Sequence, residues 1–379
     1  MLQERKLAFN FGSRRLQTRH TRTQNPRIDF CDIYGAPSRT RKEFPKSDRF
    51  YDNGHPNIAF VLDPDEHARQ HKSFASQFRA STVCTQELIV HAHVDLWTAG
   101  FPAVPLDVSK WFEWLTFDTI GELTFGESLN ATRDNKNLPW VSILLNAAYS
   151  GSIFNLCKRR QVHRPARCHD PCPHRKRIEA GPARSDVGDS LAHAIRARGM
   201  SDTELANQAM VLLTAGAETS ATALTATLWY LAQPAHAPYL EQLHIADATA
   251  RLPYLKAVLE ETMRLFPPSP VGPPRIRPPG GETVDGTFVP GGVYVSADVW
   301  TDHHEARTVG GRPDRFEPER WCNGREKPYT VPFSIGPRAV LAFDWKLAEG
   351  AAGGSGNWVE EAKLKQLRQK LPLMMHFRR

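Results

Sequence analysis

The chain has 379 residues, of which 41% are hydrophobic and 23% are charged. That is enough apolar material for a sizeable core and too much for a disordered chain. The formal net charge of +7 comes largely from residues 158–177, which hold eight basic residues and one acid. This stretch is broken by Pro and Cys and has no aromatic residue except His, so it indicates a solvated loop. No nucleic-acid partner is expected.

The six cysteines are few and scattered, which differs from the disulfide framework of a small secreted domain and favours a reducing compartment. The stretch 168–174 offers two Cys and two His as possible zinc ligands. Because prolines break it, closing a tetrahedral site would be difficult, and a surface loop or wrongly translated sequence is the better interpretation. No segment reaches the roughly 18 apolar residues of a membrane span.

The residues before about position 64 are rich in Arg, Pro and Asn, and predict loops and short strands. Apolar and charged residues then recur at helical spacing over 65–78 and 87–97. Residues 111–125 predict a further helix that is apolar on more than one side, and therefore buried.

The clearest helix runs over about 201–233, because Ser201 and Glu204 have the spacing of a capping box and Pro234 ends the pattern. Its centre, 215–220, is small and polar. Gly216 lowers helix stability by about 1 kcal/mol relative to Ala. It therefore indicates either the close approach of something flat and bulky or helix packing through small residues, and this stretch alone favours neither.

A helix over about 252–266 places Glu261 and Arg264 on one face, three residues apart. Most such pairs lie on the surface and contribute little. After residue 270, Gly-Gly and Pro-Gly-Gly turns separate short strands. The sequence therefore predicts a mainly α fold with a small β portion, as a single domain over residues 1–379.

Three motifs follow one another along the chain. Residues 215–220 read Ala-Gly-Ala-Glu-Thr-Ser, 261–264 read Glu-Thr-Met-Arg, and 316–321 read Phe-Glu-Pro-Glu-Arg-Trp. Each is weak alone, but in this order they resemble the cytochrome P450 family of heme-thiolate monooxygenases. The resemblance is strongest to the fungal members that oxidise secondary metabolites, mycotoxins among them. It covers most of the chain and implies a cytochrome P450-like fold, here incomplete.

The resemblance implies roles around a heme b cofactor. Glu218 and Thr219 would be catalytic, with the threonine hydroxyl hydrogen-bonded to bound oxygen and helping to deliver protons. Gly216 would let the helix backbone approach the porphyrin. Arg275 and Arg338 would bind the heme carboxylates, a task suited to guanidinium groups.

A second implied group is structural. Glu261, Arg264 and Arg320 would form a buried charge network near the proximal side of the heme. Removing one member of such a set costs about 3–5 kcal/mol. This network would serve folding more than chemistry.

The heme-ligating cysteine of the family is absent. Residues 333–340 read Phe-Ser-Ile-Gly-Pro-Arg-Ala-Val, so Val340 stands where the thiolate that binds iron is expected. Valine has no lone pair, so no metal ligand is assigned, and Cys322 lacks the glycine-containing loop that would present a sulfur to iron. Residues 343–347 resemble the family well beyond the ligand. A misplaced splice boundary and a genuine deletion would both produce this loss of the cysteine loop.

One further position departs from the family pattern. Near residue 70 the family carries Trp/His-x-x-x-Arg, whose arginine reaches a heme carboxylate. His67 and His71 occupy the two positions here. A histidine would serve only weakly, and both are expected to be solvated helix residues.

The leading hypothesis is a heme-dependent monooxygenase that hydroxylates or epoxidises an apolar secondary metabolite, a terpenoid or polyketide, in a fungal biosynthetic pathway. The resemblance implies O2 as co-substrate and NADPH-cytochrome P450 reductase as partner. The alternative is a catalytically inactive P450-like protein without heme, acting as a scaffold or having no function. Fungal members sit on the endoplasmic-reticulum membrane through an N-terminal helix; the chain begins past that helix, so its localisation stays undetermined.

Overall fold

The computed structural model describes residues 26–37, 43–51, 57–74, 80–101, 105–136, 200–247, 253–322, 328–338 and 374–375. Three features noted in the sequence lie outside the described residues. They are the basic stretch 158–177, the Cys/His cluster within it, and Val340.

The N-terminal part contains two helices, α1 (Pro26–Tyr34) and α2 (Asp48–Tyr51), so the expectation of loops and short strands alone is wrong there. Pro26 suits the first turn of α1, where its missing N–H is no loss. The helix is held by tertiary packing, because Phe30 and Tyr34 are buried in a cluster with Val331. Such short helices depend on packing more than on propensity, which is why periodicity did not reveal them.

Three helices predicted from the sequence are confirmed with shifted ends: α3 (Pro64–Phe74), α4 (Ala80–Ala99) and α5 (Val108–Phe125). The short helix α6 (Ala131–Asp134) follows α5. Asp107 caps the N-terminus of α5, since its side chain accepts a hydrogen bond from the Ser109 amide, and Gly126 with φ 77° caps the C-terminus. Fourteen of its 18 residues are buried, as its apolar sequence predicts.

The longest helix is α10 (Asp202–Leu231), and its predicted capping box is confirmed. The Glu204 amide donates to Ser201 Oγ at 3.2 Å, and the Ser201 amide donates to Glu204 Oε2 at 2.8 Å. The 3-10 turn η1 (Pro234–His236) and helix α11 (Ala237–Asp247) follow, neither of which the sequence analysis predicted. Next comes α12 (Pro253–Leu265), as expected.

The β portion consists of short antiparallel pairs. Strand β1 (Leu106–Asp107) pairs with β6 (Met374–Met375), β2 (Arg275–Ile276) with β5 (Tyr294–Val295), and β3 (Glu282–Val284) with β4 (Thr287–Val289). After β5 come the helices α13 (Val299–His304) and α14 (Ala306–Val309) and the 3-10 turn η2 (Pro318–Trp321). The predicted mainly α fold with a small β portion is confirmed.

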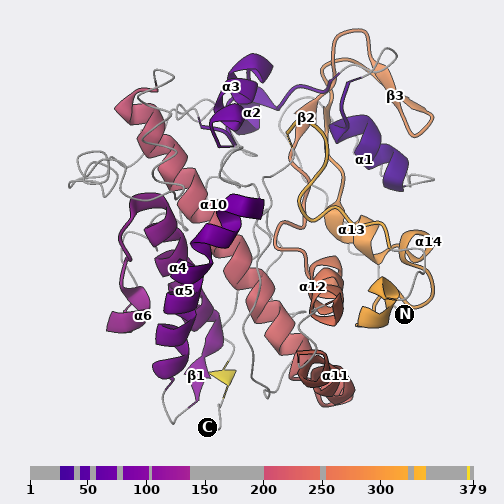
Figure 1. Cartoon of the computed structure of the whole chain (residues 1–379). Coiled ribbons are helices and arrows are strands. Elements are labelled where there is room, and N and C mark those ends of the chain that lie inside the picture. Colours follow the sequence, from indigo (N-terminus) through magenta and orange to yellow (C-terminus); the bar gives the residue numbers. More distant parts are fainter. Residues whose placement is uncertain are drawn as a thin grey trace.

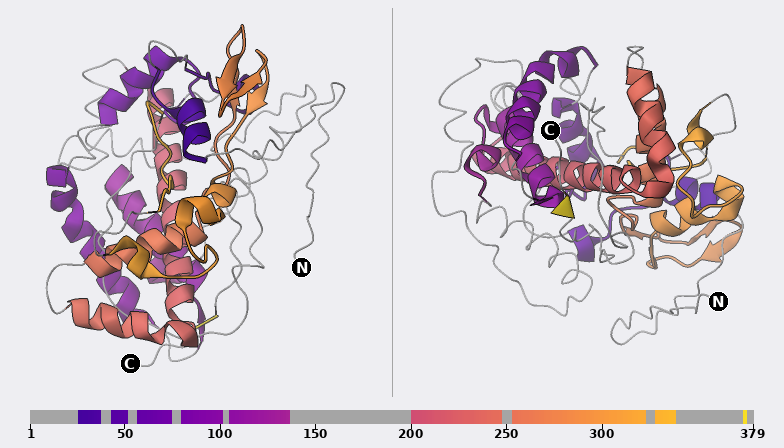
Figure 2. Two further views of the ribbon diagram at one scale, coloured as in Figure 1. Left: turned by 90° about the vertical axis from the view of Figure 1, so that its right-hand side faces the viewer. Right: turned by 90° about the horizontal axis from the view of Figure 1, so that it is seen from below.

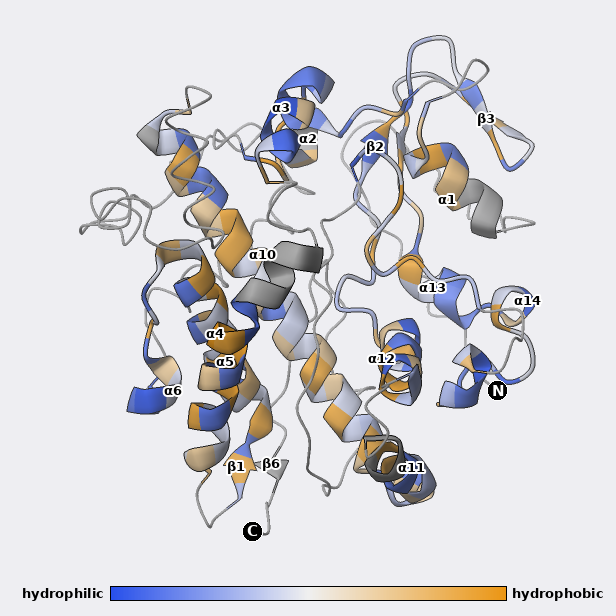
Figure 3. Ribbon diagram, in the orientation of Figure 1, coloured by the Kyte–Doolittle hydropathy of each residue, from blue (hydrophilic) through white to orange (hydrophobic). Residues whose placement is uncertain are grey.

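The elements gather around α10, which crosses the molecule with α4 and α5 on one side and α12 on the other (Figure 1). Figure 2 shows from two further directions that the strands β2–β5 lie apart from the α4–α5 pair, whereas β1 directly precedes α5. In Figure 3, hydrophobic residues recur along α5 and α10, whereas α3 is mostly hydrophilic. The main core joins α4, α5, α10 and α12 through buried residues that include Trp111, Tyr230, Val258 and Phe266. Within the described ranges, no helix has the length and apolar character needed to cross a membrane.

Candidate functional site

The centre of α10 packs against α5 at Gly216. A Cβ added to this glycine would lie 3.2 Å from Ile120 Cδ1, so the space beside its α-carbon is already filled by the neighbouring helix. Helix packing through a small residue, one of the two interpretations that the sequence left open, therefore accounts for Gly216. A role toward a porphyrin stays a prediction.

Glu218 and Thr219 differ in their exposure although they are adjacent on α10. Glu218 is buried, and its backbone carbonyl accepts a hydrogen bond from Thr222 Oγ1 at 2.8 Å. Thr219 is partly exposed, and its hydroxyl donates to the Ala215 carbonyl at 2.6 Å. Ala215 is exposed, so Ala215 and Thr219 mark the accessible side of the helix at this point. The Thr219 oxygen keeps its acceptor capacity there.

The carboxylate of Glu261 is the centre of a buried charge network, together with Arg264 and Arg320. Glu261 and Arg264 have side chains with 0% exposure, and Arg264 donates from Nε and Nη2 to the two carboxylate oxygens at 2.9 and 2.8 Å. Arg320 Nε lies 3.4 Å from Glu261 Oε1. This pair is therefore not the exposed decoration that most i, i+3 pairs are.

The sequence analysis missed two further donors to Glu261. The Glu317 amide donates to Oε1 at 3.0 Å, and the indole N–H of Trp321 donates to Oε2 at 2.9 Å. Arg320 is also held by the Glu317 carboxylate at 2.7 Å. Glu317 and Trp321 belong to the same sequence motif, 316–321, as Arg320. This motif therefore supplies three contacts to the Glu261 carboxylate. The carboxylates of Glu261 and Glu317 balance the guanidinium groups of Arg264 and Arg320.

A second cluster of charges gathers where β2 meets the chain before α2. Arg275 is 3% exposed, and its Nε has no hydrogen-bond partner among the described residues. Its guanidinium lies 5.5 Å from the ring of Tyr34. Burial lowers the pKa of Arg275, and the charge of Arg338 acts in the same direction. A buried guanidinium without a carboxylate is costly, so this site favours an anion.

Arg338 reaches the same cluster from the segment 328–338, which is anchored at three points. The Val331 amide donates to His303 Nε2 at 3.0 Å. Gly336, with φ 78°, approaches α1 so closely that a Cβ would overlap the Tyr34 carbonyl oxygen. Arg338 itself donates to the carbonyls of Val61 and Leu62 at 3.2 and 3.1 Å. The side chain that the resemblance places near the cofactor is therefore fixed in direction.

His303 maintains one of these anchors. It is completely buried, and burial lowers its pKa to about 3, with the nearby His304 and Arg264 acting in the same direction. The imidazole is therefore neutral at neutral pH, and its Nε2 can accept the Val331 amide proton. The sequence offered no motif for this residue.

Lys46 is a third basic residue of the cluster, and the sequence analysis did not identify it. Its side chain is 6% exposed, and Nζ donates to the Ala59 carbonyl at 2.7 Å. Lys46 and Arg275 face one another in an antiparallel bridge. Burial lowers the pKa of Lys46 to about 6, and the charges of Arg338 and Arg275 contribute to that shift. The only sequence signal was a lysine in an apolar context, Phe44-Pro45-Lys46.

His67 also belongs to this cluster, so the expectation of a solvated residue is wrong for it. His67 lies on α3 and is 6% exposed, whereas His71 is half-buried. The two imidazole rings are stacked, with their centroids 5.9 Å apart. Burial lowers the pKa of His67 to about 3, and Arg338, Lys46, His71 and Arg275 act in the same direction. The neutral imidazole adds no charge to the three cations, and Glu43, 3.4 Å from Arg338 Nε, is the carboxylate that approaches them.

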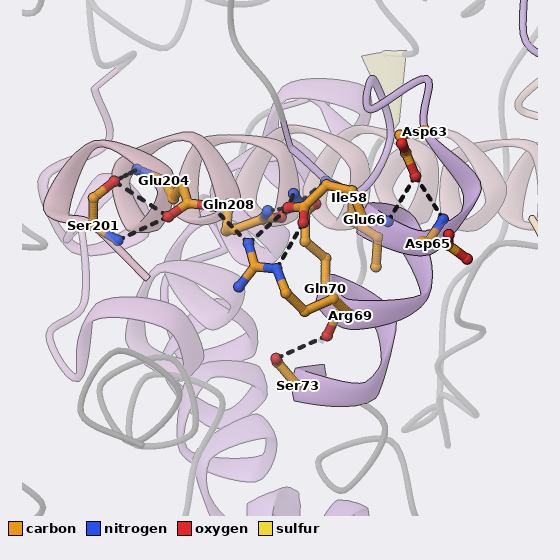
Figure 4. Close-up of polar contacts among 10 residues, drawn as sticks. All are labelled: Ile58, Asp63, Asp65, Glu66, Arg69, Gln70, Ser73, Ser201, Glu204 and Gln208. Atoms are coloured by element: carbon orange, nitrogen blue, oxygen red, sulfur yellow. Dashed lines mark hydrogen bonds and ion pairs between the residues drawn. The ribbon is translucent and has the colours of Figure 1, made fainter. Parts of the chain in front are cut away.

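A polar network ties α3 to α10 beside this cluster (Figure 4). Gln208 of α10 donates to Gln70 Oε1 at 2.8 Å and accepts from the Ile58 amide at 3.0 Å. Arg69 donates to Glu204 Oε1 at 2.7 Å and so joins α3 to the capping box of α10. The loop 57–63, whose carbonyls hold Lys46 and Arg338, is thereby fixed to both helices.

The cation cluster, defined as Lys46, Arg275 and Arg338 with His67 beside them, fits one part of heme b and not another. Heme b carries two carboxylates, and the orphaned Nε of Arg275 beside two further buried cations suits them. The sequence analysis expects the iron-binding thiolate at Val340, whose side chain offers no donor atom. Among the described cysteines, Cys31 is exposed and Cys322 contacts the Pro318 carbonyl at 3.8 Å, away from the segment that carries Arg338.

The model of the family described as Cytochrome P450 matches residues 34–339. The chain therefore belongs to the cytochrome P450 family. The match covers all eight residues that the sequence analysis placed in the site and ends one residue before Val340.

Curated relatives from fungi share this family. The chain is 32% identical over 351 residues to the cytochrome P450 monooxygenase stcF of Emericella nidulans, covering 81% of this chain and 72% of that protein. It is 31% identical over 375 residues to a trichothecene C-15 hydroxylase of Fusarium sporotrichioides, covering 83% and 75%. The cytochrome P450 monooxygenase astJ of Aspergillus oryzae is 29% identical, covering 84% and 72%. The resemblance to the fungal group of cytochrome P450 monooxygenases is confirmed.

A solved structure supports the fold. A zebrafish cytochrome P450 with abiraterone matches with a TM-score of 0.60 and 20% sequence identity, covering 82% of this chain and 76% of that one. At this identity the likeness concerns the fold. The predicted cytochrome P450-like fold is confirmed.

Proposed function

We propose that this protein is a heme-dependent monooxygenase that hydroxylates or epoxidises an apolar secondary metabolite, a terpenoid or polyketide, in a fungal biosynthetic pathway. Residues 1–379 form one domain in this proposal. The cation cluster is the observation that supports heme binding, since Arg275 and Arg338 bring buried guanidinium groups to a place where Glu43 is the one ion-pair partner among the described residues. The substrate class is supported by relatives such as the trichothecene hydroxylase.

The chain's own residues divide the work as follows. Arg275 and Arg338 would bind the heme carboxylates and so orient the cofactor. Heme, when bound, supplies the activation of O2 once a reductase has delivered two electrons. Thr219 lies on the accessible side of α10. Its hydroxyl donates a hydrogen bond to the Ala215 carbonyl, and its oxygen can still accept a hydrogen bond from a proton donor. Glu218 is the neighbouring buried residue, and its carboxylate is the second group that could take part in proton delivery.

The partners follow from the same class of chemistry. O2 is the co-substrate, and NADPH-cytochrome P450 reductase is the electron donor. We place the functional protein at the endoplasmic-reticulum membrane, where fungal members of the family work.

The alternative function is a catalytically inactive P450-like protein without heme. One observation favours it: Val340 stands at the position of the iron ligand. In that case Arg275 and Arg338 would remain from an ancestral cofactor site, and the chain would act as a scaffold or have no function.

The test begins with the transcript across the codons for residues 338–341. A cysteine-containing insert would support the monooxygenase, and the chain that includes it should then bind heme with the optical spectrum of a thiolate ligand. If the message encodes Arg338-Ala339-Val340 without an insert, a chain that takes up no heme would establish the inactive alternative.

A further inference from the structure

The charge balance of the cation cluster points to a further ligand-binding residue. Lys46 is the one lysine that is buried in the part of the chain that the structure describes. Its ammonium group donates to two neutral carbonyls, Ala59 at 2.7 Å and Ile58 at 3.4 Å, and lies 5.0 Å from the ring of Tyr51. In the same part of the chain it makes no ion pair with a carboxylate. Folding alone gives no reason to bury this charge.

The neighbours of Lys46 make its burial still more costly. Lys46 and Arg275 are directly opposite one another in the antiparallel bridge, and like charges in that position are destabilising. Arg338 adds a third positive charge, and its one carboxylate partner, Glu43, lies 3.4 Å from Nε with a side chain that is 27% exposed. When Lys46 is protonated, three basic side chains face one partly exposed carboxylate among the described residues, and a dianion would balance this excess of positive charge.

Lys46 and Arg338 are also positioned by one loop. The carbonyls of residues 58 and 59 hold the lysine, and those of Val61 and Leu62 hold the arginine. This loop is fixed to α10 by the hydrogen bond from the Ile58 amide to Gln208. Donors oriented in this way before a ligand arrives are a feature of binding sites.

We propose that Lys46 is a cofactor-binding residue that donates from Nζ to a carboxylate of the bound heme, beside Arg275 and Arg338. The inference rests on the proposed function. The shared ligand chemistry is a pair of carboxylates, which either a porphyrin or a free dicarboxylate could present.

The test compares hemin with hemin dimethyl ester, in which both carboxylates are masked, by quenching of tryptophan fluorescence in the full chain. Lys46→Met should weaken hemin binding about tenfold, equivalent to about 1.4 kcal/mol, and leave the ester's affinity unchanged. Lys46→Arg should restore most of the hemin affinity. Lys72→Met removes an exposed lysine from α3 and should change neither affinity.

Three outcomes would contradict the inference. If Lys46→Met weakens hemin and its ester equally, the lysine acts through folding and does not contact a carboxylate. If glutarate, a dicarboxylate without a ring, displaces hemin at matching concentration, the cluster is a site for free dicarboxylates. If the wild-type chain binds neither hemin nor its ester, the proposed function fails first, and the role of Lys46 fails with it.

Discussion

The molecule contains two buried charge clusters that differ in one respect. Around Glu261, two carboxylates face two guanidinium groups, and both Glu261 oxygens accept several hydrogen bonds. Around Arg275, two guanidinium groups and the amine of Lys46 share one partly exposed carboxylate among the described residues, where the Arg275 Nε has no hydrogen-bond partner. In the first cluster the chain itself balances the charges, although the Arg320 Nε has only an ion pair with Glu261 at 3.4 Å and no hydrogen bond among the described residues. In the second cluster a bound anion would balance the charges.

This difference separates residues that stabilise the fold from residues that bind. Where the chain supplies all the partners of a buried charge, substituting that residue lowers the free energy of unfolding strongly. A buried charge whose partner is a ligand destabilises the unliganded fold. Its removal should therefore lower ligand affinity far more than it lowers the free energy of unfolding. Substitutions in the two clusters should therefore have opposite profiles.

The largest effect is expected at Glu261. Glu261→Gln removes the carboxylate that faces Arg264 and Arg320, and should lower the free energy of unfolding by about 3–5 kcal/mol. Urea denaturation followed by circular dichroism measures this change. Glu241→Gln, at an exposed glutamate of α11, is the matched control and should change stability by less than about 0.5 kcal/mol. Equal stability of the two variants would mean that the Glu261 network is not a folding element.

The complementary substitution is Arg275→Met in the open cluster. It removes a guanidinium that would bind a heme carboxylate, so hemin affinity should fall about 10- to 100-fold. The free energy of unfolding of the unliganded chain should stay the same or rise, because a like charge leaves the neighbourhood of Lys46 and Arg338. Fluorescence titration and urea denaturation on one preparation give both values. A loss of stability as large as that of Glu261→Gln would remove the distinction between the two clusters.

The open cluster should also make stability depend on pH. The pKa of Lys46 is about 6 in the folded chain and about 10.4 when unfolded, so between these values the unfolded chain holds a proton that the folded chain lacks. Stability therefore rises with pH in this window. The charged groups that face Lys46 are Arg275, Arg338 and Glu43. His67 lies beside them, and with a pKa of about 3 its imidazole stays neutral between pH 7 and 9.

Urea denaturation of the unliganded chain at pH 7, 8 and 9 measures this dependence. The wild-type chain should gain up to about 1.4 kcal/mol per pH unit relative to Lys46→Met. Lys72→Met, which removes an exposed charge, should follow the wild type. Parallel curves for the wild type and Lys46→Met would show that Lys46 is not neutral in the folded chain at these pH values.

The sequence predicted the elements with strong local signals. The capping box at Ser201 and Pro234 located the two ends of α10, and the apolar sequence of 111–125 located α5. Short helices such as α1 and α11 were missed because tertiary contacts hold them, and a window of nine or eleven residues contains little periodicity.

The sequence predicted one charge cluster better than the other, because only one of them is built from residues in sequence motifs. Glu261, Arg264 and Arg320 lie in sequence motifs, so their grouping could be expected and only the added donors, such as Trp321, were missed. Lys46 lies in no motif, and its place beside Arg275 follows from a pairing between segments more than 200 residues apart. His67 was expected in solvent because α3 is hydrophilic as a whole, while its burial depends on what packs against one face.

The smallest effect is expected at the tie between α3 and α10, which joins the region of the open cluster to the helix that carries Thr219. The ion pair between Arg69 and Glu204 is 2.7 Å long, but the two side chains are 34% and 25% exposed, so solvent screens it. Arg69→Ala, Glu204→Ala and the double variant form a cycle whose coupling energy should be about 0.5 kcal/mol. Because Glu204 also belongs to the capping box, the single variant Glu204→Ala should lose about 1 kcal/mol more than the coupling explains. A coupling energy above about 2 kcal/mol would place this pair with the closed cluster, as an ion pair on which the fold depends.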